Sequence, residues 1–216
     1  MIDLHTHTFF SDGCLSPSEL VYRAKLSGYE AIAICDHLDQ SNLDFVIPRI
    51  TKVCDSLTKE YGIIVVPGAE ITYVPPRLIA SVISEARKLG AHIIVVHGET
   101  PAEKLPPGTN HEAILAGTDV LAHPGLITEE DVALAKSKGV CLEITARKMH
   151  SSTNRHVARL AKKIGAELVL DTDSHGPEDL INDERAFEIV KACGLKKEDL
   201  ERMFSNSRKL INRRIP

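Results

Sequence analysis

The chain has 216 residues, 43% of them hydrophobic and 26% charged, with a formal net charge of -4 and a pI near 6.2. This composition is typical of a globular protein rather than a disordered or fibrous one. Nucleic-acid binders usually carry a basic face, so the acidic balance weakens that class of function without excluding a local basic pocket. No apolar stretch approaches the roughly 20 residues that span a bilayer, and no secretory signal is visible. We therefore expect a cytoplasmic protein with no membrane partner.

The cysteines are odd in number and form no C-x-x-C pair: they are Cys14, Cys35, Cys54, Cys141 and Cys193. This pattern argues against a disulfide framework and against a thiolate zinc finger. We expect reduced, structural cysteines. The ten histidines are a high count for a chain of this length, and they need a functional explanation.

Short β-branched runs alternate with amphipathic segments along the chain. The pattern predicts strands at residues 2–4, 31–35, 63–67, 92–96, 120–122, 140–145 and 168–171. Most of these are nearly continuous apolar runs, which is typical of parallel strands buried on both faces.

Helix signals separate the predicted strands. Ser16 begins the capping-box sequence SPSE with proline at the first helical position, and TEED (128–131) places acidic residues in a first turn. Glycines at 28, 90, 139 and 165 follow helical stretches, and a final helix is expected at 199–214.

Seven β-then-α units predict a parallel sheet covered by helices, in a single domain over residues 1–216. A closed barrel and an open doubly wound sheet both fit this pattern. No GxGxxG or GxxxxGK loop follows the first strand, which disfavours a nucleotide-binding open sheet.

Six of the seven predicted strands are followed by a histidine or a carboxylate. These residues are His5, His7, His37, Glu70, His97, His123, Asp173 and His175. In a parallel barrel, all these strand ends lie on one rim, where active sites form. Residues i and i+2 of an extended chain face the same way, so His5 with His7, and Asp173 with His175, can each hold one ion.

Imidazole nitrogen with carboxylate oxygen suits zinc, manganese or iron, whereas calcium prefers oxygen alone. Together with Asp12 there are nine candidate ligands, and a single ion uses about three or four protein ligands. More than one metal is therefore expected, with Glu70 as the bridge. The other histidines, His92, His111, His150 and His156, are expected to be structural, although the loops of His111 and His150 could border the cleft.

Several short motifs resemble those of the polymerase-and-histidinol-phosphatase (PHP) superfamily. They are HTHTFFSDG (5–13), ICDH (34–37), GAE (68–70), VVHGE (95–99), AHPG (122–125) and DTDSH (171–175). Each motif alone is weak, and their number and order carry the resemblance. It implies a distorted seven-stranded (β/α)7 barrel with three divalent ions, commonly zinc, manganese or iron.

The resemblance also implies which residues hold each ion. The first would be held by His5, His7, Glu70 and Asp173, the second by Glu70, His97 and His123, and the third by Asp12, His37 and His175. Asp171 is not required as a ligand in this family, so we interpret it as inward-facing support.

The chemistry implied is phosphoester hydrolysis, because two ions that share a water lower its pKa towards neutrality. Glu70 and Asp173 are the expected catalytic carboxylates. Arg147 follows the one strand without a ligand, and its guanidinium matches phosphate bidentately, so it is the candidate substrate contact, with Lys148 a weaker alternative. Glu143 could orient a metal-bound imidazole, or could be structural.

The compact chain favours a small phosphomonoester as substrate, with histidinol phosphate named by resemblance only. A phosphodiesterase or 3'-5' exonuclease that acts on nucleotides or nucleic-acid ends is the alternative, and a metal-stabilised module that binds without turnover is the third hypothesis. The loops at 71–80, 99–112 and 147–153 are expected to set specificity.

Overall fold

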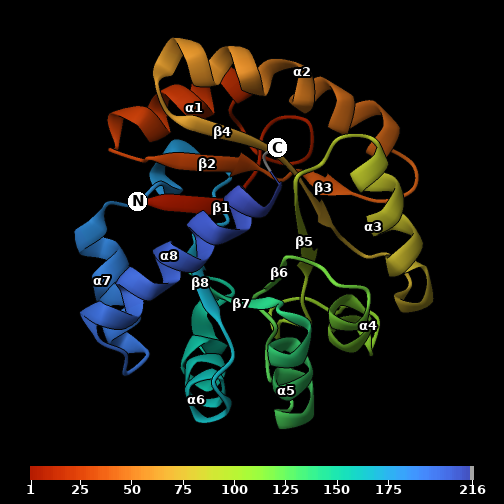
Figure 1. The fold of residues 1–216 in the computed structure, drawn as a ribbon, viewed down its shortest axis with the longest axis vertical. Helices are drawn as coiled ribbons and strands as arrows, with labels where there is room; N and C mark the ends of the chain where they lie inside the picture. The colour runs from red at the N-terminus through yellow and green to blue at the C-terminus, as the bar shows by residue number, and fades with distance from the viewer. Residues whose placement is uncertain (215–216) are drawn as a thin grey trace.

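The computed structural model describes residues 1–214, which form a single α/β domain with a nearly closed parallel barrel (Figure 1). The strands of the barrel, in spatial order, are β1 (Ile2–Thr6), β2 (Ala31–Ile34), β4 (Ile64–Ile71), β5 (Ile93–His97), β6 (Val120–Ala122), β7 (Cys141–Thr145) and β8 (Leu168–Asp171). A short β3 (His37–Leu38) pairs with the end of β4. The predicted seven-stranded barrel is confirmed.

Helices follow the strands along the chain. They are α1 (Pro17–Leu26), α2 (Leu43–Tyr61), α3 (Ile79–Lys88), α4 (Thr109–Leu115), α5 (Glu129–Lys138), α6 (Asn154–Ile164), α7 (Asp183–Ala192) and α8 (Lys197–Arg214). The predicted caps form, because Ser16 accepts a hydrogen bond from the amide of Glu19 and Thr128 accepts one from the amide of Asp131. Within residues 1–214, none of the helices combines the length and apolar character needed to cross a bilayer.

The largest difference from the predicted strands is at β4. The sequence predicts a strand that stops at Pro67, because Pro67 and Gly68 together are typical of a break. The structure continues β4 to Ile71, pairing Gly68 with Ile93 and Glu70 with Val95 of β5. Parallel pairing to a strand that is distant in sequence therefore overrides the local signal, and it carries Glu70 to the rim.

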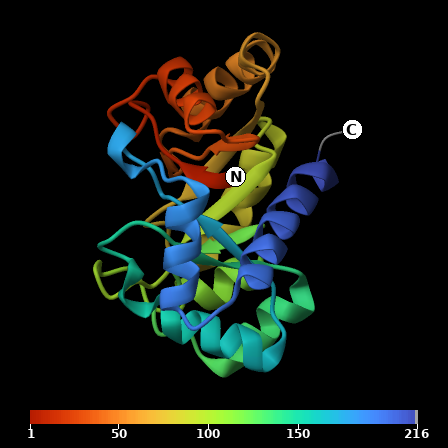
Figure 2. The ribbon, with the colours of Figure 1, turned by 90° about the vertical axis from the view of Figure 1, so that its left-hand side faces the viewer.

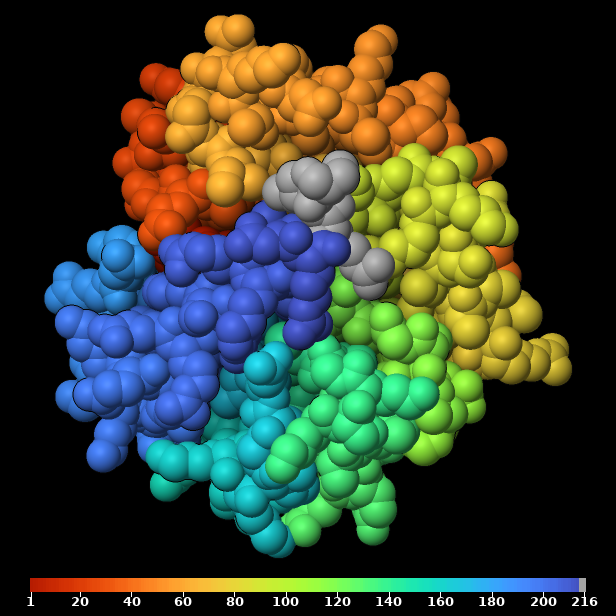
Figure 3. Space-filling view, in the orientation of Figure 1, coloured from red at the N-terminus to blue at the C-terminus, as the bar shows by residue number. Residues whose placement is uncertain are grey.

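Inward-facing strand residues fill the barrel with a small apolar core. This core contains Ile2, Leu4, Ala33, Val66, Val95 and Val169, together with Leu210 and Ile211 of α8. The side-chain amide of Asn206 in α8 donates to the carbonyl of Leu168, where β8 begins. Helix α8 therefore closes the end of the barrel where the strands begin, and it lies across the face shown in Figure 3. The polar rim is at the opposite end.

All five cysteines are free, as expected, and all but Cys14 are buried. Cys35 lies within the barrel core, where burial raises the pKa of its thiol well above the usual range. A protonated thiol under the rim agrees with a structural role.

The seam between β1 and β8 is closed by two buried carboxylates rather than by a continuous ladder. A single bridge joins Thr6 to Ser174. Below it, Asp171 accepts a hydrogen bond of 2.7 Å from the amide of Leu4. Asp3 accepts hydrogen bonds from the amide and the hydroxyl of Thr172, at 3.1 and 2.6 Å. Burial raises the pKa of Asp3 to about 6 and that of Asp171 well above its usual range. Asp171 thus supports the fold from the barrel interior.

Replacing Asp3 with alanine should weaken this seam. Asp3→Ala leaves the buried amide and hydroxyl of Thr172 without their acceptor, and an unsatisfied buried polar group costs about 1–3 kcal/mol. We expect the free energy of unfolding, measured by urea denaturation, to fall by about that amount. Asp55→Ala, at an exposed position of α2, is the control. Equal unfolding midpoints for the two variants would contradict the role of Asp3.

Candidate metal centre

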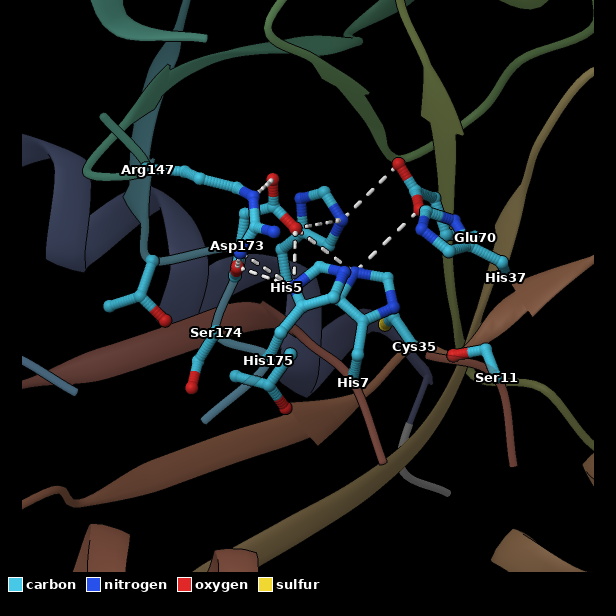
Figure 4. A network of polar contacts seen from close by, with 12 residues as sticks. His5, His7, Ser11, Cys35, His37, Glu70, Arg147, Asp173, Ser174 and His175 are labelled. Carbon is cyan, nitrogen blue, oxygen red and sulfur yellow. Dashed lines mark hydrogen bonds and ion pairs between the residues drawn. The ribbon is translucent and has the colours of Figure 1, made fainter. Parts of the chain in front are cut away.

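All nine predicted ligands come together at the carboxyl end of the barrel. Figure 4 labels six of them, namely His5, His7, His37, Glu70, Asp173 and His175. Of the nine, those that are buried are His5, His7, Glu70, His97, His123 and Asp173. His37 and His175 are half-buried, and Asp12 is exposed at the mouth. That they bind metal stays a prediction, and the geometry below tests whether they fit one.

Glu70 lies at the centre of the cluster and has no exposed surface. Its Oε1 lies 3.2 Å from Nε2 of His5 and 3.1 Å from Nδ1 of His97. Its Oε2 lies 3.7 Å from Nε2 of His7 and also contacts His37. One carboxylate therefore faces imidazoles from several strand ends, as a bridging ligand must.

Among the described residues, five sets of donor atoms at this rim are each compact enough for one ion, and three of these sets consist entirely of predicted ligands. The other two combine His123 with His5 and Glu143, or with His150 and Asp173. Of the three sets of predicted ligands, His5, His7 and Asp173 form the first, and Oδ1 of Asp173 lies 3.1 Å from Nε2 of His7. Glu70, His97 and His123 form the second.

The third group lies nearest the solvent and consists of Asp12, His37 and His175 together with His7. Oδ1 of Asp12 lies 3.1 Å from Nε2 of His175 and 3.6 Å from Nε2 of His37. Only the second set has the same members as the set that the resemblance implies. The first lacks Glu70, although Oε1 of Glu70 lies 3.2 Å from Nε2 of His5, and the third includes His7 as well. That these sets hold ions stays a prediction.

The buried nitrogens of this cluster fit cations better than they fit one another. Nε2 of His5, both ring nitrogens of His7 and Nε2 of His97 have no hydrogen bond, although they are buried. Folded proteins rarely leave buried polar atoms without a partner, and a metal ion satisfies an imidazole lone pair as well as a hydrogen-bond donor does. Imidazole and carboxylate donors together suit divalent transition ions. The residues present therefore fit such ions.

Glu143 orients two of the imidazoles from beneath. Its Oε2 lies 2.6 Å from Nδ1 of His5, and its Oε1 lies 3.2 Å from Nδ1 of His123. A carboxylate accepts at both positions, so each Nδ1 carries a proton and each Nε2 is turned towards the cluster. The orienting role considered for Glu143 agrees with this geometry.

Interlocking loops place His97 and His123 beside each other. An added Cβ at Gly98 would lie 2.2 Å from the carbonyl oxygen of Ala122, and one at Gly125 would lie 2.0 Å from that of Glu99. Only glycine allows these two loops to approach so closely. Nε2 of His123 consequently lies 3.0 Å from Nδ1 of His97.

Backbone strain is concentrated at the same rim. Within residues 1–214, the non-glycine residues with positive φ are Tyr73, His123 and Asp173, at 56°, 26° and 52°. Such conformations cost on the order of 1–3 kcal/mol and persist only where the surroundings enforce them. Two of the three are candidate ligands, so the fold stores strain where it positions donor atoms.

The electrostatics of the cluster oppose the cost of burial. Burial disfavours the charge on Glu70, but His37, His5 and His97 together hold its pKa well below the usual range. Asp173 behaves in the same way, with its pKa lowered mainly by His5 and His7. Burial lowers the pKa of His7 to about 4. Ionised carboxylates and a neutral His7 are the forms that bind metal.

The loop that carries Asp12 is held by Asp36 of the ICDH motif. The buried carboxylate of Asp36 accepts hydrogen bonds from the amide and the hydroxyl of Thr8, both at 2.8 Å. It also accepts one of 2.7 Å from the hydroxyl of Ser11. Asp36 therefore fixes the position of the exposed ligand without touching the cluster itself.

Sequence reasoning missed Glu103 and left His150 among the structural histidines. His150 is buried and stacks on His123, with 4.3 Å between ring centroids, and its Nε2 lies 3.6 Å from Oε1 of Glu103. Oε2 of Glu103 lies 3.4 Å from Nε2 of His97 and accepts a hydrogen bond from the Tyr73 hydroxyl. The loop of His150 does border the cleft, as the sequence allowed, and the signal for it was its place after β7.

The other histidines expected to be structural include two with clear partners away from the centre. His156 contacts the carbonyl oxygen of Ile127, and the exposed His111 contacts Asp131.

Arg147 reaches the rim, whereas Lys148 lies away from it. Nη1 of Arg147 donates to the carbonyl oxygen of Asp173 at 3.0 Å and lies 2.9 Å from Nδ1 of His175 (Figure 4). Lys148 lines a separate cavity together with Ser151 and Arg155. Arg147 is thus the cation beside the candidate ligands, and a substrate contact by either residue stays a prediction.

Comparison with known families finds that residues 3–182 match the PHP domain. An uncharacterized protein of Methanocaldococcus jannaschii, MJ1295, is 42% identical over 215 residues, which is 99% of each chain. A 5'-3' exoribonuclease of Haemophilus influenzae is 40% identical over 70 residues, 32% of this chain and 23% of that protein. A probable phosphatase of Shewanella sp. strain ANA-3 is 34% identical over 100 residues, 41% of this chain and 40% of that protein.

Solved structures share the fold at low sequence identity. A chain in the cryo-EM structure of archaeal ribonuclease P with mature tRNA superposes with a TM-score of 0.76 and 18% identity, covering 99% of this chain and 91% of that one. A two-domain protein of Bacteroides vulgatus that contains a predicted PHP-like metal-dependent phosphoesterase gives a TM-score of 0.54 at 17% identity, covering 99% of this chain and 62% of that one.

The role of Glu143 can be tested by Glu143→Gln. The glutamine side chain keeps the volume but has only one acceptor oxygen. It can therefore accept a hydrogen bond from only one of the two Nδ1 groups that Glu143 contacts. We expect the affinity for Zn²⁺ or Mn²⁺, measured by competition with a chromogenic chelator, to fall by about 10–100-fold. The control is Glu178→Gln at an exposed position, which should keep the metal affinity and the thermal unfolding midpoint of the wild type. Wild-type metal affinity in Glu143→Gln would show that the carboxylate does not orient the ligands.

Proposed function

The chain belongs to the PHP domain family, and from that premise we propose that it is a metal-dependent phosphoesterase. The observation that carries this proposal is the set of three donor groups that share or adjoin Glu70. We propose three divalent ions, zinc, manganese or iron, and a small phosphomonoester as the preferred substrate. Similarity to a probable phosphatase over part of the chain supports this choice.

When bound, the ions would supply an ionised water at neutral pH and positive charge for the phosphate oxygens. Glu70 would hold the first and second groups at a fixed spacing, because its Oε1 faces both His5 of the first group and His97 of the second. Asp173 would fix the first group beside Arg147. The guanidinium of Arg147 would then bind the phosphate and balance charge as the ester bond breaks.

A cavity of about 360 Å³ lies beside the centre and would receive the leaving group. Its lining includes Asp12, His37, Asp39, Tyr73 and Glu103. A volume of this size suits a small molecule. Carboxylates and hydroxyls on its walls favour a leaving group that carries hydroxyl or amino groups. These features support a small, polar phosphomonoester.

The first test is hydrolysis of p-nitrophenyl phosphate by protein loaded with Mn²⁺ or Zn²⁺. His97→Ala removes a donor of the second group and should lower kcat/KM by at least about 100-fold, while the far-UV circular dichroism stays that of the wild type. Removing the metal with a chelator should abolish turnover, and adding Mn²⁺ or Zn²⁺ should restore it. The control is His111→Ala, because His111 is exposed and pairs with Asp131 instead of the centre.

The same assay separates the alternatives. Preference for bis(p-nitrophenyl) phosphate over the monoester would favour a phosphodiesterase or exonuclease. A fully metallated protein without turnover on either ester, or on a panel of phosphomonoesters, would leave the non-catalytic metal-binding module. Near-normal turnover in His97→Ala would refute the assigned centre.

The two candidate substrate cations form a matched pair. Arg147→Gln removes the guanidinium beside Asp173 and should lower kcat/KM for p-nitrophenyl phosphate by about 100-fold. Lys148→Gln removes a cation from the neighbouring cavity and should change kcat/KM by less than about twofold, because an exposed charge is screened by solvent. Equal losses of kcat/KM in both variants would mean that activity depends on overall positive charge rather than on contact between Arg147 and the substrate.

A further inference from the structure

A groove runs down the outside of the barrel between α6 and the segment that joins α7 to α8. Figure 2 shows the backbone of α7 and α8 on this side of the molecule. Three adjoining cavities of about 340, 390 and 420 Å³ make up this α6 groove. The first and second share Arg155 and Cys193, and the second and third share Lys162 and Leu195. The cavities are therefore continuous.

The exposed side of α6 lines this groove with a single file of cations. Arg155, Arg159 and Lys162 follow one another at the i, i+4, i+7 spacing that places residues on one helix face, and all three are exposed. The neighbouring Lys163 pairs with Glu129 and Arg185 pairs with Glu188. Across residues 1–214, the file of three has no carboxylate partner in an ion pair. Carboxylates of Glu167, Glu188 and Asp199 also line the cavities, but cations outnumber them, so positive charge is in excess in the groove.

The basic end of α8 shows the opposite arrangement. The sequence alone draws attention to α8, where Arg208 and Lys209 lie close together. In the structure Arg208 pairs with Glu30 and Lys209 lies 3.8 Å from Glu167. In a chain with a net charge of -4, the excess positive charge on α6 is therefore a local feature of the groove.

The groove starts beside the loop that follows β7, next to the candidate centre but separate from it. Arg147 and Lys148 lie on the loop between β7 and α6, and Lys148 lines the first cavity with Arg155. From Arg155 to Lys162 the helix advances by about 10 Å, over which a stacked strand of nucleic acid carries about three phosphates. The cations thus extend from beside the candidate centre at the spacing of a phosphate chain.

We propose that the α6 groove binds the phosphate backbone of a single-stranded nucleic acid, whose end reaches the metal centre. A single file of cations in a groove suits one strand better than the broad face of a duplex. A small phosphoester held at the centre would have no contact with Arg159 or Lys162, so those cations are available to a second, longer anionic ligand. Binding of the strand in the groove does not depend on the proposed function. Only cleavage at the end of the strand rests on the proposed function.

The test is binding of a short fluorescein-labelled single-stranded RNA, followed by fluorescence anisotropy at several salt concentrations. The variant Arg155→Gln/Arg159→Gln/Lys162→Gln should bind at least about tenfold more weakly at low salt. The slope of log K against log salt should fall by about 2, because each phosphate contact on a single strand contributes about 0.7.

The matched control, Arg208→Gln/Lys209→Gln/Arg213→Gln, removes the same formal charge from α8 and should change the affinity by less than about twofold. Equal weakening in both variants would show a response to net charge only and would overturn the proposal. Wild-type affinity in the α6 variant, no RNA binding by the wild type, or tighter binding of duplex than of single strand would also overturn it.

Hydrolysis of p-nitrophenyl phosphate should be unchanged in the α6 variant, because none of its three positions lies at the centre. If RNA binding depends on the α6 cations but the protein hydrolyses no ester, the result refutes the proposed function and supports nucleic-acid binding by the α6 groove. If the protein hydrolyses the ester but does not bind RNA, the result refutes nucleic-acid binding by the α6 groove and supports the proposed function. An oligonucleotide with a terminal phosphate would then show which bond is cleaved, by release of phosphate or of mononucleotide.

Discussion

Closure of the seam between β1 and β8 is the constraint on which the rest of the structure depends. The sheet begins with one strand and ends with the other, and few backbone hydrogen bonds join them. Asp3 and Asp171 supply the missing acceptors from inside the barrel. Because of this closure, the residues that follow β1 meet those that follow β8, and His7 lies 3.1 Å from Asp173. A seam one residue out of register would turn these side chains away from each other.

The centre is built so that each buried polar group is either paired or left facing the cluster. Glu143 accepts hydrogen bonds from Nδ1 of His5 and of His123, and Asp36 accepts hydrogen bonds from the loop that carries Asp12. These contacts fix ring orientations before any ion is bound, which lowers the entropy lost on binding. The buried nitrogens without a hydrogen bond are Nε2 of His5, Nε2 of His97 and both ring nitrogens of His7.

The sequence predicted the fold and the donor atoms well because both depend on short-range patterns. Buried strands are visible as apolar runs, and a parallel barrel brings the polar residue after each strand to one rim. The sequence did not place Glu103 and His150 at the rim, because they reach it from loops, and the path of a loop follows no periodic pattern. The role of Asp3 escaped for a related reason: its partner Thr172 lies 169 residues away. The sequence also did not reveal the unpaired cations of α6, because ion pairing in the folded structure, rather than composition, determines which cations lack a carboxylate partner.

Electrostatics also determine how the rim would receive a phosphate. The carboxylates of Asp12, Glu70, Glu103, Glu143 and Asp173 gather around the rim, and Arg147 is the guanidinium beside them. The neighbouring carboxylates raise the pKa of His5 and of His37 despite burial, so imidazolium charges offset part of this negative charge when no metal is bound. On the function proposed above, divalent ions would replace these protons, a conversion that adds positive charge to the rim and favours a phosphate there. The unpaired cations of α6 need no such conversion, so a polyanion can dock there whether or not the centre is loaded.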